Sequence, residues 1–457
     1  MTNEIEVYEL KEKLTELLEQ KKYRELKAEL TDMPEADIAE FLDELSFEMA
    51  MPIFRLLSKQ KAVEVFSYFQ SETQEKIITS ITDKEIKGII EELSVDDAVD
   101  MLEEMPASIV RRVLANATTK TRDTINRFLN FPEDSVGTIM TAEFTDIKGN
   151  MTVGDVIEHL RRVADHKETI YTCYIISPSR VLEGVIELCD ILACRDDTTL
   201  ISDIMETNVV KAVTTEHRET AAELFSKYDL HTLPVVDNEN RLVGIVTADD
   251  IYDVIEEEAT KDIEQMAAIL PMEDEYLKAG VFTIVKKRIV WLLVLMITGI
   301  LTGSILGGFE ETISTIPLLV TFMPMLLNTG GNSGSQASIT VIRGLTTGEL
   351  EASDVWKILW KELRVSLVVG VLFAIINFAM VYVMAYGSAE RIMVALVVSL
   401  AMLVTIVLAK GIGAVLPIIA KKLNLDPTVM ATPLITTAVD VCAMLVYFGL
   451  AVRLLSI

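Results

Sequence analysis

Cysteine is scarce in this 457-residue chain. It occurs only as Cys173, Cys189, Cys194 and Cys442, and this spacing matches neither a zinc site nor a Cys-x-x-Cys redox motif. We therefore expect four reduced thiols rather than a disulfide framework or a structural metal site.

The sequence also lacks the usual signatures of catalysis. It holds four histidines, and it contains no nucleophile–histidine–acid set, no phosphate-binding loop and no ATPase motif. We therefore expect that the chain is not an enzyme.

A signal peptide is a third missing feature. The first residues, MTNEIEVYEL, contain neither a basic segment nor an apolar core. We expect the N-terminal half of the chain to stay in the cytosol.

Charge is distributed very unevenly along the chain. Residues 1–275 hold 60 acidic and 28 basic residues, a net charge of −32, whereas residues 276–457 hold 9 acidic and 13 basic residues, a net charge of +4. A strongly acidic soluble half argues against nucleic acid and favours cations as partners. The apolar second half predicts a membrane domain.

Five uncharged apolar runs predict membrane-spanning helices at residues 289–309, 312–342, 365–389, 392–409 (apolar as far as Ala420) and 427–452. Each run reaches the ~20 residues that cross ~30 Å of hydrocarbon. The basic residues near these runs gather before the first, between the second and third, and between the fourth and fifth: Lys286, Lys287, Arg288, Arg343, Lys357, Lys361, Arg364, Lys421 and Lys422. The positive-inside rule makes these segments cytosolic and places the C-terminus outside.

The second run is interrupted by the polar segment NTGGNSGSQ, residues 328–336. Small residues permit close packing of helices, whereas Asn328, Asn332 and Gln336 are more than packing alone requires. Two interpretations stay open, a small-residue packing seam and a polar segment that lines a water-filled path. The amide side chains favour the path.

Asp440 is the one charge in the fifth run, PTVMATPLITTAVDVCAMLVYFGLAV. A carboxylate at that depth costs at least ~2.5 kcal/mol and usually faces a cavity or a partner. Thr432, Thr436 and Asp440 share one helical face, and Pro433 is expected to free a backbone carbonyl one turn earlier. Hard oxygen ligands of this kind suit Mg²⁺ or Ca²⁺. The alternative is a structural aspartate that is protonated or paired with Lys410.

One carboxylate per chain supplies few charged ligands for a divalent cation. Two chains around a symmetry axis would supply two carboxylates, so we expect a homodimer with the path at its axis.

Residues 132–256 contain an internal repeat. The pair IM recurs at 139–140 and 204–205, and LEGVIELCDIL (182–192) matches LVGIVTADDIYDVI (242–255), with Gly184 opposite Gly244 and Asp190 opposite Asp250. Each unit predicts a helix, two strands around a glycine turn and another helix. The repeat resembles a tandem pair of CBS domains, a regulatory α/β module that senses ligands.

Residues 1–131 show the 3.6-residue periodicity of short amphipathic helices, as in EADIAEFLDEL (35–45) and SVDDAVDMLEEM (94–105). Pro34, Pro52 and Pro106 separate the helices, which predicts an all-α superhelix. Residues 249–280 predict a long connecting helix, whose part after the CBS pair is 257–280. Asp250, Asp253, Glu257, Glu258 and Asp262 follow one face of it. These like charges repel unless cations lie between them, so the face is either solvated or binds divalent ions.

The order of these parts, together with LLNTGGNSGSQ in the second run and LDPTVMATPLITTAVDV in the fifth, resembles the MgtE family of magnesium channels or transporters. The resemblance implies a multidomain membrane protein of the plasma membrane, with an N domain (1–131), a CBS pair (132–256), a connecting "plug" helix (257–280) and a five-helix transmembrane domain (281–457). It also implies a homodimer whose pore carboxylate, Asp440, holds hydrated Mg²⁺, with Asn328, Asn332, Gln336, Thr432 and Thr436 lining the pore.

The resemblance further implies that cytosolic Mg²⁺ closes the pore by binding between the soluble parts. The matching acidic positions are Glu64, Asp96, Asp100, Asp229, Asp250, Asp253, Glu258, Asp262 and, at the cytosolic mouth of the last span, Asp426. ATP is a candidate ligand of the CBS pair. Two departures stand out: Thr432 replaces the Asn or Gly that often precedes the proline, and Lys261 and His217 stand where acidic sensor residues are expected.

Three functional hypotheses remain at this point. The leading one is a Mg²⁺-selective channel, gated by Mg²⁺ and driven by the membrane potential. A divalent-cation carrier coupled to Na⁺ or H⁺ is the nearest alternative, although one membrane carboxylate is sparse for coupling. The third is a CBS nucleotide sensor that transports nothing.

Overall fold

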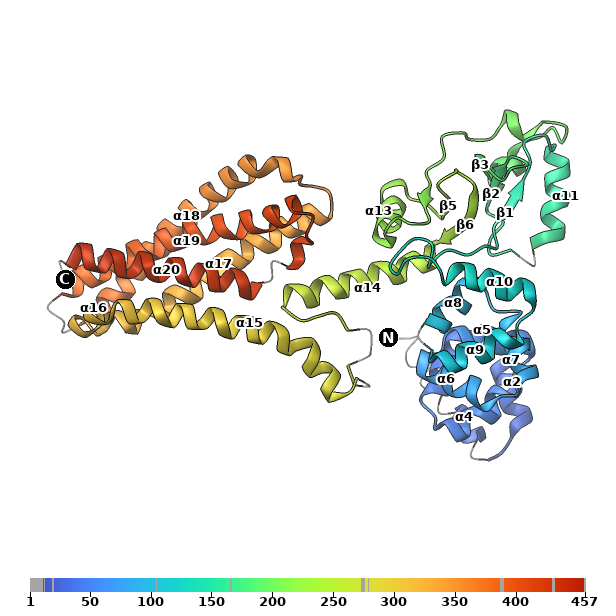
Figure 1. Cartoon of the computed structure of the whole chain (residues 1–457), viewed down its shortest axis with the longest axis horizontal. Coiled ribbons are helices and arrows are strands. Elements are labelled where there is room, and N and C mark those ends of the chain that lie inside the picture. Colours follow the sequence, from blue (N-terminus) through green and yellow to red (C-terminus); the bar gives the residue numbers. More distant parts are fainter. Residues whose placement is uncertain are drawn as a thin grey trace. The chain divides into compact units, whose positions relative to one another are not determined.

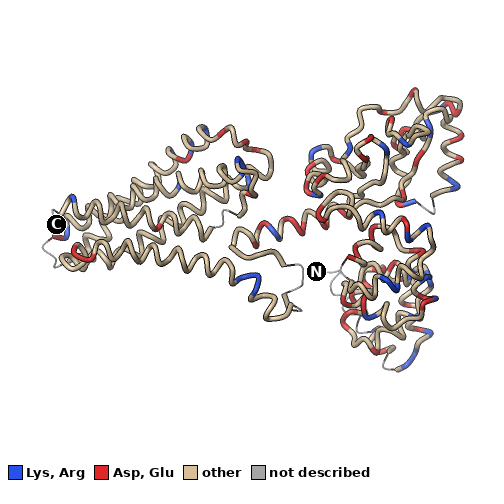
Figure 2. The backbone as a smooth tube through the Cα atoms, viewed as in Figure 1, with Lys and Arg blue, Asp and Glu red and all other residues tan. Residues whose placement is uncertain are grey.

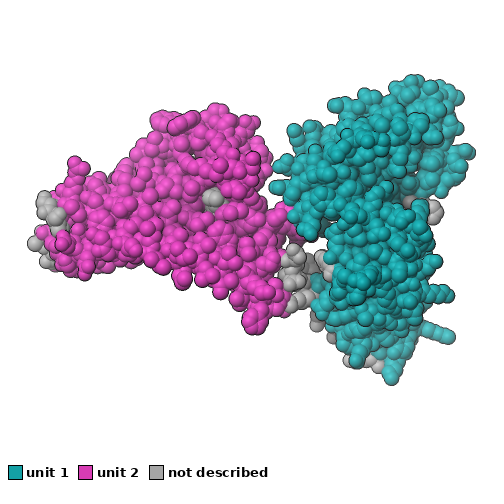
Figure 3. Space-filling model, in the orientation of Figure 1, with its two compact units in different colours: residues 1–255 teal, residues 256–457 magenta. Residues whose placement is uncertain are grey.

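The computed structural model describes residues 11, 13–18, 20–103, 105–164, 167–272, 276–277, 279–386, 390–429 and 432–455. The chain divides into two compact units, Met1–Ile255 (unit 1) and Glu256–Ile457 (unit 2) (Figures 1 and 3). The boundary falls inside one helix, α14 (Ala248–Met266). Each unit is described separately.

Unit 1 begins with a succession of short amphipathic helices. Local signals set their starts: Thr82 and Glu85 form a reciprocal capping box before α7, and Pro34 and Pro106 stand at the N-caps of α3 and α9. Pro52 lies inside α4 rather than between helices. The helices are α2 (Tyr23–Asp32), α3 (Glu35–Asp43), α4 (Phe47–Phe54), α5 (Lys59–Ser67), α6 (Ser71–Ser80), α7 (Asp83–Ile90), α8 (Val95–Glu103), α9 (Ala107–Asn116) and α10 (Thr119–Phe128).

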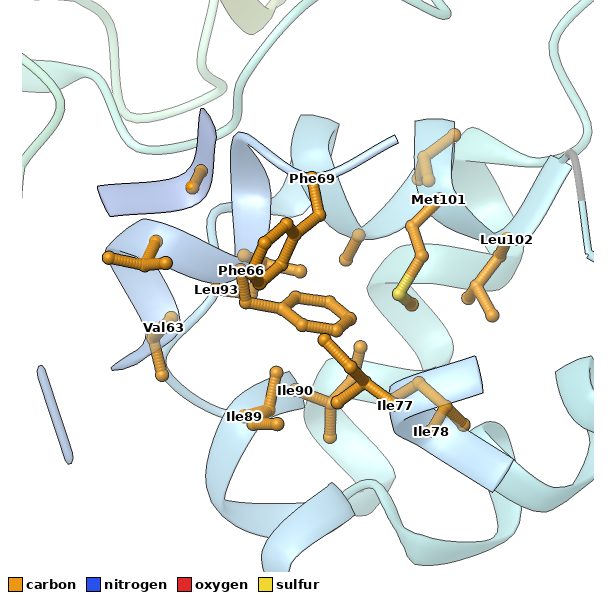
Figure 4. Packing of buried hydrophobic residues seen from close by; sticks show 14 of the residues in the cluster. Val63, Phe66, Phe69, Ile77, Ile78, Ile89, Ile90, Leu93, Met101 and Leu102 are labelled. Carbon is orange, nitrogen blue, oxygen red and sulfur yellow. The ribbon is translucent and has the colours of Figure 1, made fainter. Parts of the chain in front are cut away.

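The apolar faces of these helices meet in one core. Phe66 and Phe69 pack against each other in this core, together with Ile77, Ile90 and Met101, which come from three other helices (Figure 4). Burial of these faces, rather than the propensity of helices only 8 to 10 residues long, holds the helices in place.

Two three-stranded sheets follow, each with a parallel and an antiparallel pair, in the orders β1-β2-β3 and β4-β5-β6. The first repeat contains β1 (Thr145–Ile147), α11 (Val153–Val163), β2 (Thr172–Ile176), β3 (Leu182–Glu187), α12 (Leu188–Ala193) and the 3₁₀ turn η2 (Ile201–Asp203). The second contains β4 (Ala212–Val213), α13 (Arg218–Tyr228), β5 (Thr232–Val236), β6 (Leu242–Thr247) and the start of α14.

The glycines of the repeat have a clear packing role. A Cβ on Gly244 would lie 2.8 Å from the Met140 sulfur, and a Cβ on Gly184 would lie 3.0 Å from the Met205 sulfur. The IM pair of each repeat therefore packs on the sheet of the other, and only glycine leaves room for it. This exchange explains why the two motifs recur together in the sequence.

The predicted long helix over 249–280 is wrong at its C-terminal end. Helix α14 ends at Met266, because Ala268 takes a left-handed conformation (φ 58°) and the amide of Ile269 bonds the carbonyl of Glu264. Pro271 then prevents the helix from continuing. Residues 273–275 and 278 of the predicted helix lie outside the described residues.

Unit 2 is helical. Its elements are α15 (Val281–Gly308), α16 (Glu310–Thr315), α17 (Leu318–Thr346), the 3₁₀ turn η3 (Ala352–Asp354), α18 (Val355–Met384), α19 (Arg391–Lys422), the 3₁₀ turn η4 (Pro427–Val429) and α20 (Thr432–Leu455). Among the described residues, four helical segments are long and apolar enough to span a membrane: α15, η3 with α18, α19 and α20. Acidic side chains are frequent along unit 1, whereas the long helices of unit 2 are mostly uncharged (Figure 2).

The second predicted span, α17, has 29 residues but carries the polar segment in its middle. The five-span count therefore stays a prediction. The polar segment does not interrupt the helix: α17 is continuous through residues 328–336, and the break lies earlier, at Ile316 and Pro317 between α16 and α17.

Candidate functional site

Helices α17 and α20 border an open cavity of about 190 Å³, lined by Leu327, Asn328, Gly331, Asn332, Thr436 and Asp440. Four of these residues are predicted pore residues. The structure thus brings the membrane carboxylate together with two amides and a hydroxyl that lie about a hundred residues earlier or one turn away in the sequence.

The polar segment of α17 divides by face. Asn328, Asn332 and Gln336, spaced four apart, are exposed within unit 2, and Asn332 Nδ2 donates to Asn328 Oδ1 over 3.2 Å. Gly330, Gly331, Ser333, Gly334 and Ser335 are buried. The small residues therefore form a packing seam and the amides form a polar stripe, whereas the water-filled path along that stripe stays a prediction.

Glycine at 331 lets α20 come close to this stripe. A Cβ at Gly331 would lie 3.0 Å from Thr436 Cγ2, and one at Gly330 would lie 2.6 Å from Thr405 Cγ2. Larger residues at either position would force α17 away from its neighbours, and the cavity wall that contains Asp440 would shift.

Lys410 does not neutralise Asp440. Lys410 is 7% exposed on α19, and its ammonium lies 3.5 Å from Glu362 Oε2 on α18. No basic side chain lies within salt-bridge distance of Asp440 in the described part of the chain. The alternative of an Asp440–Lys410 pair is therefore wrong, because Lys410 already has a buried partner.

The hydroxyls near Asp440 are locally bonded. Thr436 Oγ1 and Thr437 Oγ1 both donate to the Pro433 carbonyl, over 2.9 and 2.8 Å. Pro433 is the second residue of α20, where a missing N–H costs little, so it does not free a carbonyl inside the helix as predicted. Thr432, at the helix start, and Gln336 are not among the cavity-lining residues.

Unit 1 contains a second group of carboxylates, which come from α8 and from the start of α14. Burial and then the charge of Asp97 raise the pKa of Asp96 to about 6. Burial and then the charge of Asp96 raise the pKa of Asp250 to about 7, although Thr247 Oγ1 donates to its Oδ2 over 2.6 Å. Loss of hydration and the charges of Asp96 and Asp97 raise the pKa of Asp100 to about 8. Three predicted sensor residues thus lie in one repulsive cluster.

The sequence interpretation missed three members of this acidic cluster, Asp97, Asp249 and Glu168. Burial and the charges of Asp96 and Asp249 raise the pKa of Glu168 to about 7, so this loop residue belongs to the cluster. The doublets Asp96–Asp97 and Asp249–Asp250 offered a signal for the first two. Glu168 offered none, because only the fold brings it near α8.

Asp96 gives the clearest sign that a cation fits the chemistry of the cluster. Its side chain is 8% exposed, and its Oδ1 atom has no hydrogen-bond partner. A buried, unpaired carboxylate oxygen among like charges is costly unless a cation completes it. The residues present therefore fit a hard divalent ion such as Mg²⁺.

Comparison with known proteins covers nearly the whole chain. Family models match residues 33–134 (MgtE intracellular N domain), 201–257 (CBS domain) and 323–450 (divalent cation transporter). A magnesium transporter MgtE of Thermus thermophilus is 35% identical over 447 residues, which cover 97% of this chain and 98% of that protein. The chain belongs to the MgtE family.

A magnesium transporter MgtE of Bacillus subtilis is 28% identical over 95% of both chains. Two solved structures resemble the N-terminal half. One is the soluble part of a magnesium transporter (29% identity, TM-score 0.53, 55% of this chain and 99% of that chain). The other is the cytosolic domain of the Mg²⁺ channel MgtE in complex with ATP (36% identity, TM-score 0.50, 53% of this chain and 98% of that chain). The helical N domain and the CBS pair are confirmed, and the relatives are transporters rather than enzymes, as expected.

The remaining MgtE-derived positions lie at other places on the helices and turns of the chain. Glu64, on α5, is exposed and accepts from Gln60. Asp229 is the left-handed C-cap of α13. Asp426 accepts from the Thr428 amide over 2.9 Å and so caps η4. Asp253, Glu258 and Asp262 follow α14 beyond Asp250, and each makes interactions within the structure.

The two basic departures from the MgtE pattern have local roles. The Lys261 ammonium lies 3.3 Å from Glu258 Oε2, so an ammonium stands beside a predicted metal ligand. His217 is the N-cap of α13, where its ring accepts from the Glu219 amide. Both contacts favour fewer regulatory cation sites than an all-acidic surface would hold.

Proposed function

We propose that this protein transports Mg²⁺ across the plasma membrane along a path lined by α17 and α20. The observation that carries the proposal is the cavity in which Asp440, without a basic partner among the described residues, faces Asn328 and Asn332. Membership in the MgtE family, whose curated relatives are named magnesium transporters, identifies the cation.

The chemistry of the cavity suits a hydrated ion. Mg²⁺ loses its water reluctantly and is usually held through several retained waters. The Asp440 carboxylate balances the charge and accepts hydrogen bonds from those waters, and the amide oxygens of Asn328 and Asn332 supply further acceptors. A cavity of about 190 Å³ has room for such waters.

The path is completed by a second copy of the chain. One carboxylate offers half the charge of Mg²⁺, and a two-fold axis beside the cavity supplies the other half. The homodimer is therefore part of the proposal. So is the orientation with the N-terminal half in the cytosol and the C-terminus outside, which follows from the basic residues at one end of the spans.

The membrane potential drives the ion inward. A potential of ~100 mV is worth ~2.3 kcal/mol per charge, or ~4.6 kcal/mol for a divalent cation. The mode of transport is a channel. A coupled carrier would need further membrane carboxylates, and Glu362 is already paired with Lys410.

Cytosolic Mg²⁺ closes the channel by binding the acidic cluster. Without a cation, the charges of Asp96, Asp100 and Asp250 repel one another, and bound Mg²⁺ draws α8 and the start of α14 together. This regulation requires that Mg²⁺ bind the closed form better than the open form.

Helix α14 supplies a route from this cluster to the path. Near its C-terminal end, Gln265 Oε1 accepts from Thr428 Oγ1 over 2.7 Å. Thr428 belongs to η4, directly before α20, which carries Asp440. A displacement of α14 therefore acts on the turn that positions α20.

ATP is a further candidate ligand of the CBS pair, because the cytosolic domain of a relative was solved with ATP. A shift of the thermal unfolding temperature of the purified chain on addition of ATP tests this. No shift at saturating nucleotide would exclude ATP as a ligand.

Patch recording from vesicles that contain the purified chain tests the transport mode. We expect unitary Mg²⁺ currents that stop when Mg²⁺ is raised on the side of the N-terminal half. The matched variant is Asp96→Asn/Asp100→Asn, which should conduct but close only at higher Mg²⁺. Mg²⁺ flux without unitary current would identify a coupled carrier, and the absence of flux would support the non-transporting sensor.

A further inference from the structure

The first three turns of α18 combine aromatic and basic side chains on one face. Trp356, Lys357, Trp360, Lys361 and Arg364 fall within an arc of about 140° at about 100° per residue. Trp356 is 78% and Trp360 is 60% exposed, and the three cations are exposed as well. We refer to these five residues as the α18 entry face.

The same face continues along α18 as aliphatic surface. Leu367, Val368, Val371, Leu372 and Ile375 lie within about the same arc and are exposed within unit 2. An exposed aliphatic face on a membrane-spanning helix contacts acyl chains. The entry face therefore lies where the hydrocarbon gives way to headgroups, which is the level that tryptophan prefers.

Charge on the α18 entry face is only partly balanced by the protein. The Lys357 ammonium bonds Asp354 Oδ1 over 2.7 Å. Glu362 lies on the other side of the helix, 3.5 Å from Lys410. Among the described residues, Lys361 has no acidic partner, and the Arg364 guanidinium lies 5.9 Å above the Trp360 ring without a carboxylate contact.

The remaining nearby acids do not lie on this face. Glu349 and Glu351 precede the helix, and Ser353 Oγ donates to Glu351 Oε2 over 3.0 Å. Two cations flanking an exposed tryptophan are thus left to an anion from outside the protein. A phosphate at headgroup level is the complementary group, since arginine and lysine both bind phosphate oxygens.

We infer that the α18 entry face binds the headgroup of an anionic phospholipid. Lys361 and Arg364 hold its phosphate, Trp356 and Trp360 lie at the interface, and the aliphatic residues beyond contact its chains. The inference rests on the proposed membrane domain, but it requires neither Mg²⁺ transport nor gating.

The three tryptophans of the chain make a direct test possible. The substitution Trp291→Phe leaves Trp356 and Trp360 as the only tryptophans whose fluorescence is measured. The full chain is placed in vesicles of phosphatidylcholine and phosphatidylglycerol in which one of the two lipids carries brominated chains. Bromine quenches tryptophan only on contact, so the two series give the relative association of each lipid with this face.

We expect brominated phosphatidylglycerol to quench more strongly than brominated phosphatidylcholine at equal mole fraction. Lys361→Gln/Arg364→Gln should reduce the preference by about fivefold for each cation removed, and added salt should weaken it. The matched control is Lys286→Gln/Arg288→Gln on α15, which removes the same charge elsewhere and should leave the preference intact.

Equal quenching by the two lipids would overturn the inference, and so would a preference that survives Lys361→Gln/Arg364→Gln. Quenching by neither lipid would show that protein, for example a second copy of the chain, covers the face. If the chain prefers the anionic lipid but does not transport Mg²⁺, this inference stands and the proposed function is wrong.

Discussion

At the scale of single residues, helices α17 and α19 meet at glycines that leave no room for a larger side chain. A Cβ on Gly413 of α19 would collide with the backbone carbonyl of Gly334 on α17, and backbone cannot move aside as a flexible side chain can. Gly411, two residues earlier on the same helix, has no atom within 4 Å of its Cβ position. The two glycines therefore form a matched pair for mutation.

We expect Gly413→Ala to destabilise the purified chain by about 1–3 kcal/mol through overpacking, and to reduce Mg²⁺ uptake by displacing α17. Gly411→Ala should be neutral, or stabilising by about 0.5–1 kcal/mol, because alanine favours the helix. Thermal unfolding in detergent measures both. Equal stability of the two variants would show that the α17–α19 contact is looser than described.

Some site residues could be predicted from the sequence, and others could not. Asp440 is recognisable without a structure, because it is the one charge in a run of membrane length. Glu168 is not recognisable, because its partners are distant in sequence and only the fold brings them together. Gln336 lies on the same face of α17 as Asn328 and Asn332, yet it does not line the cavity. Periodicity predicts the face of a helix, but not the position along it at which a cavity forms.

At the scale of helices, α18 and α19 are joined by the buried Glu362–Lys410 pair. Removing one partner leaves an unpaired buried charge, whereas removing both leaves an apolar contact. Glu362, rather than Asp440, is the carboxylate that Lys410 contacts.

Lys410→Met should therefore cost about 3–5 kcal/mol of stability, and Glu362→Leu/Lys410→Met should recover most of that loss. Thermal unfolding of the single and double variants checks this. If the double variant were no more stable than Lys410→Met, the two side chains would not act as a pair.

Helix α14 shows a second limit of sequence analysis at this scale. Its acidic periodicity over 250–262 predicted a helix correctly, but not its end at Met266. Just beyond this end, Ala268 takes a left-handed conformation. Alanine rarely does so, and the Gly or Asn that usually marks a helix end is absent from this position.

At the scale of the whole molecule, the acidic cluster links stability to pH. Unfolded carboxyl groups have pKa values near ~4, whereas the folded pKa values of Asp96, Asp250 and Asp100 are raised to about 6, about 7 and about 8. The folded form thus holds these protons more tightly. Stability from the protonated cluster is complete below pH ~4 and is lost as pH rises toward ~8.

A fragment of residues 1–266 in a chelator should therefore unfold at a lower temperature at pH 8 than at pH 6, and Mg²⁺ should restore the loss at pH 8. Solved relatives of similar span support the use of the fragment. Calorimetry of the wild type against Asp100→Asn/Asp250→Asn provides the comparison. Equal responses of both to pH and Mg²⁺ would show that the cluster is not the sensor.

The order of the parts was predictable because each has its own periodicity: short amphipathic helices, a glycine-marked repeat and long apolar runs. The contacts between parts were not predictable. The exchange of Met140 and Met205 between the two sheets, and the joining of α8 to α14 through carboxylates, depend on packing that no local pattern encodes.

Mg²⁺ uptake by the Asp440→Ala variant tests the central claim most directly. Glu349→Gln, which removes an exposed carboxylate outside the cavity, is the control. In cells that lack other Mg²⁺ systems, we expect the wild type and the control to support growth at low Mg²⁺, and Asp440→Ala, present in the membrane at equal amount, to fail. Wild-type uptake by Asp440→Ala would contradict the account, because the cavity would then not be the path.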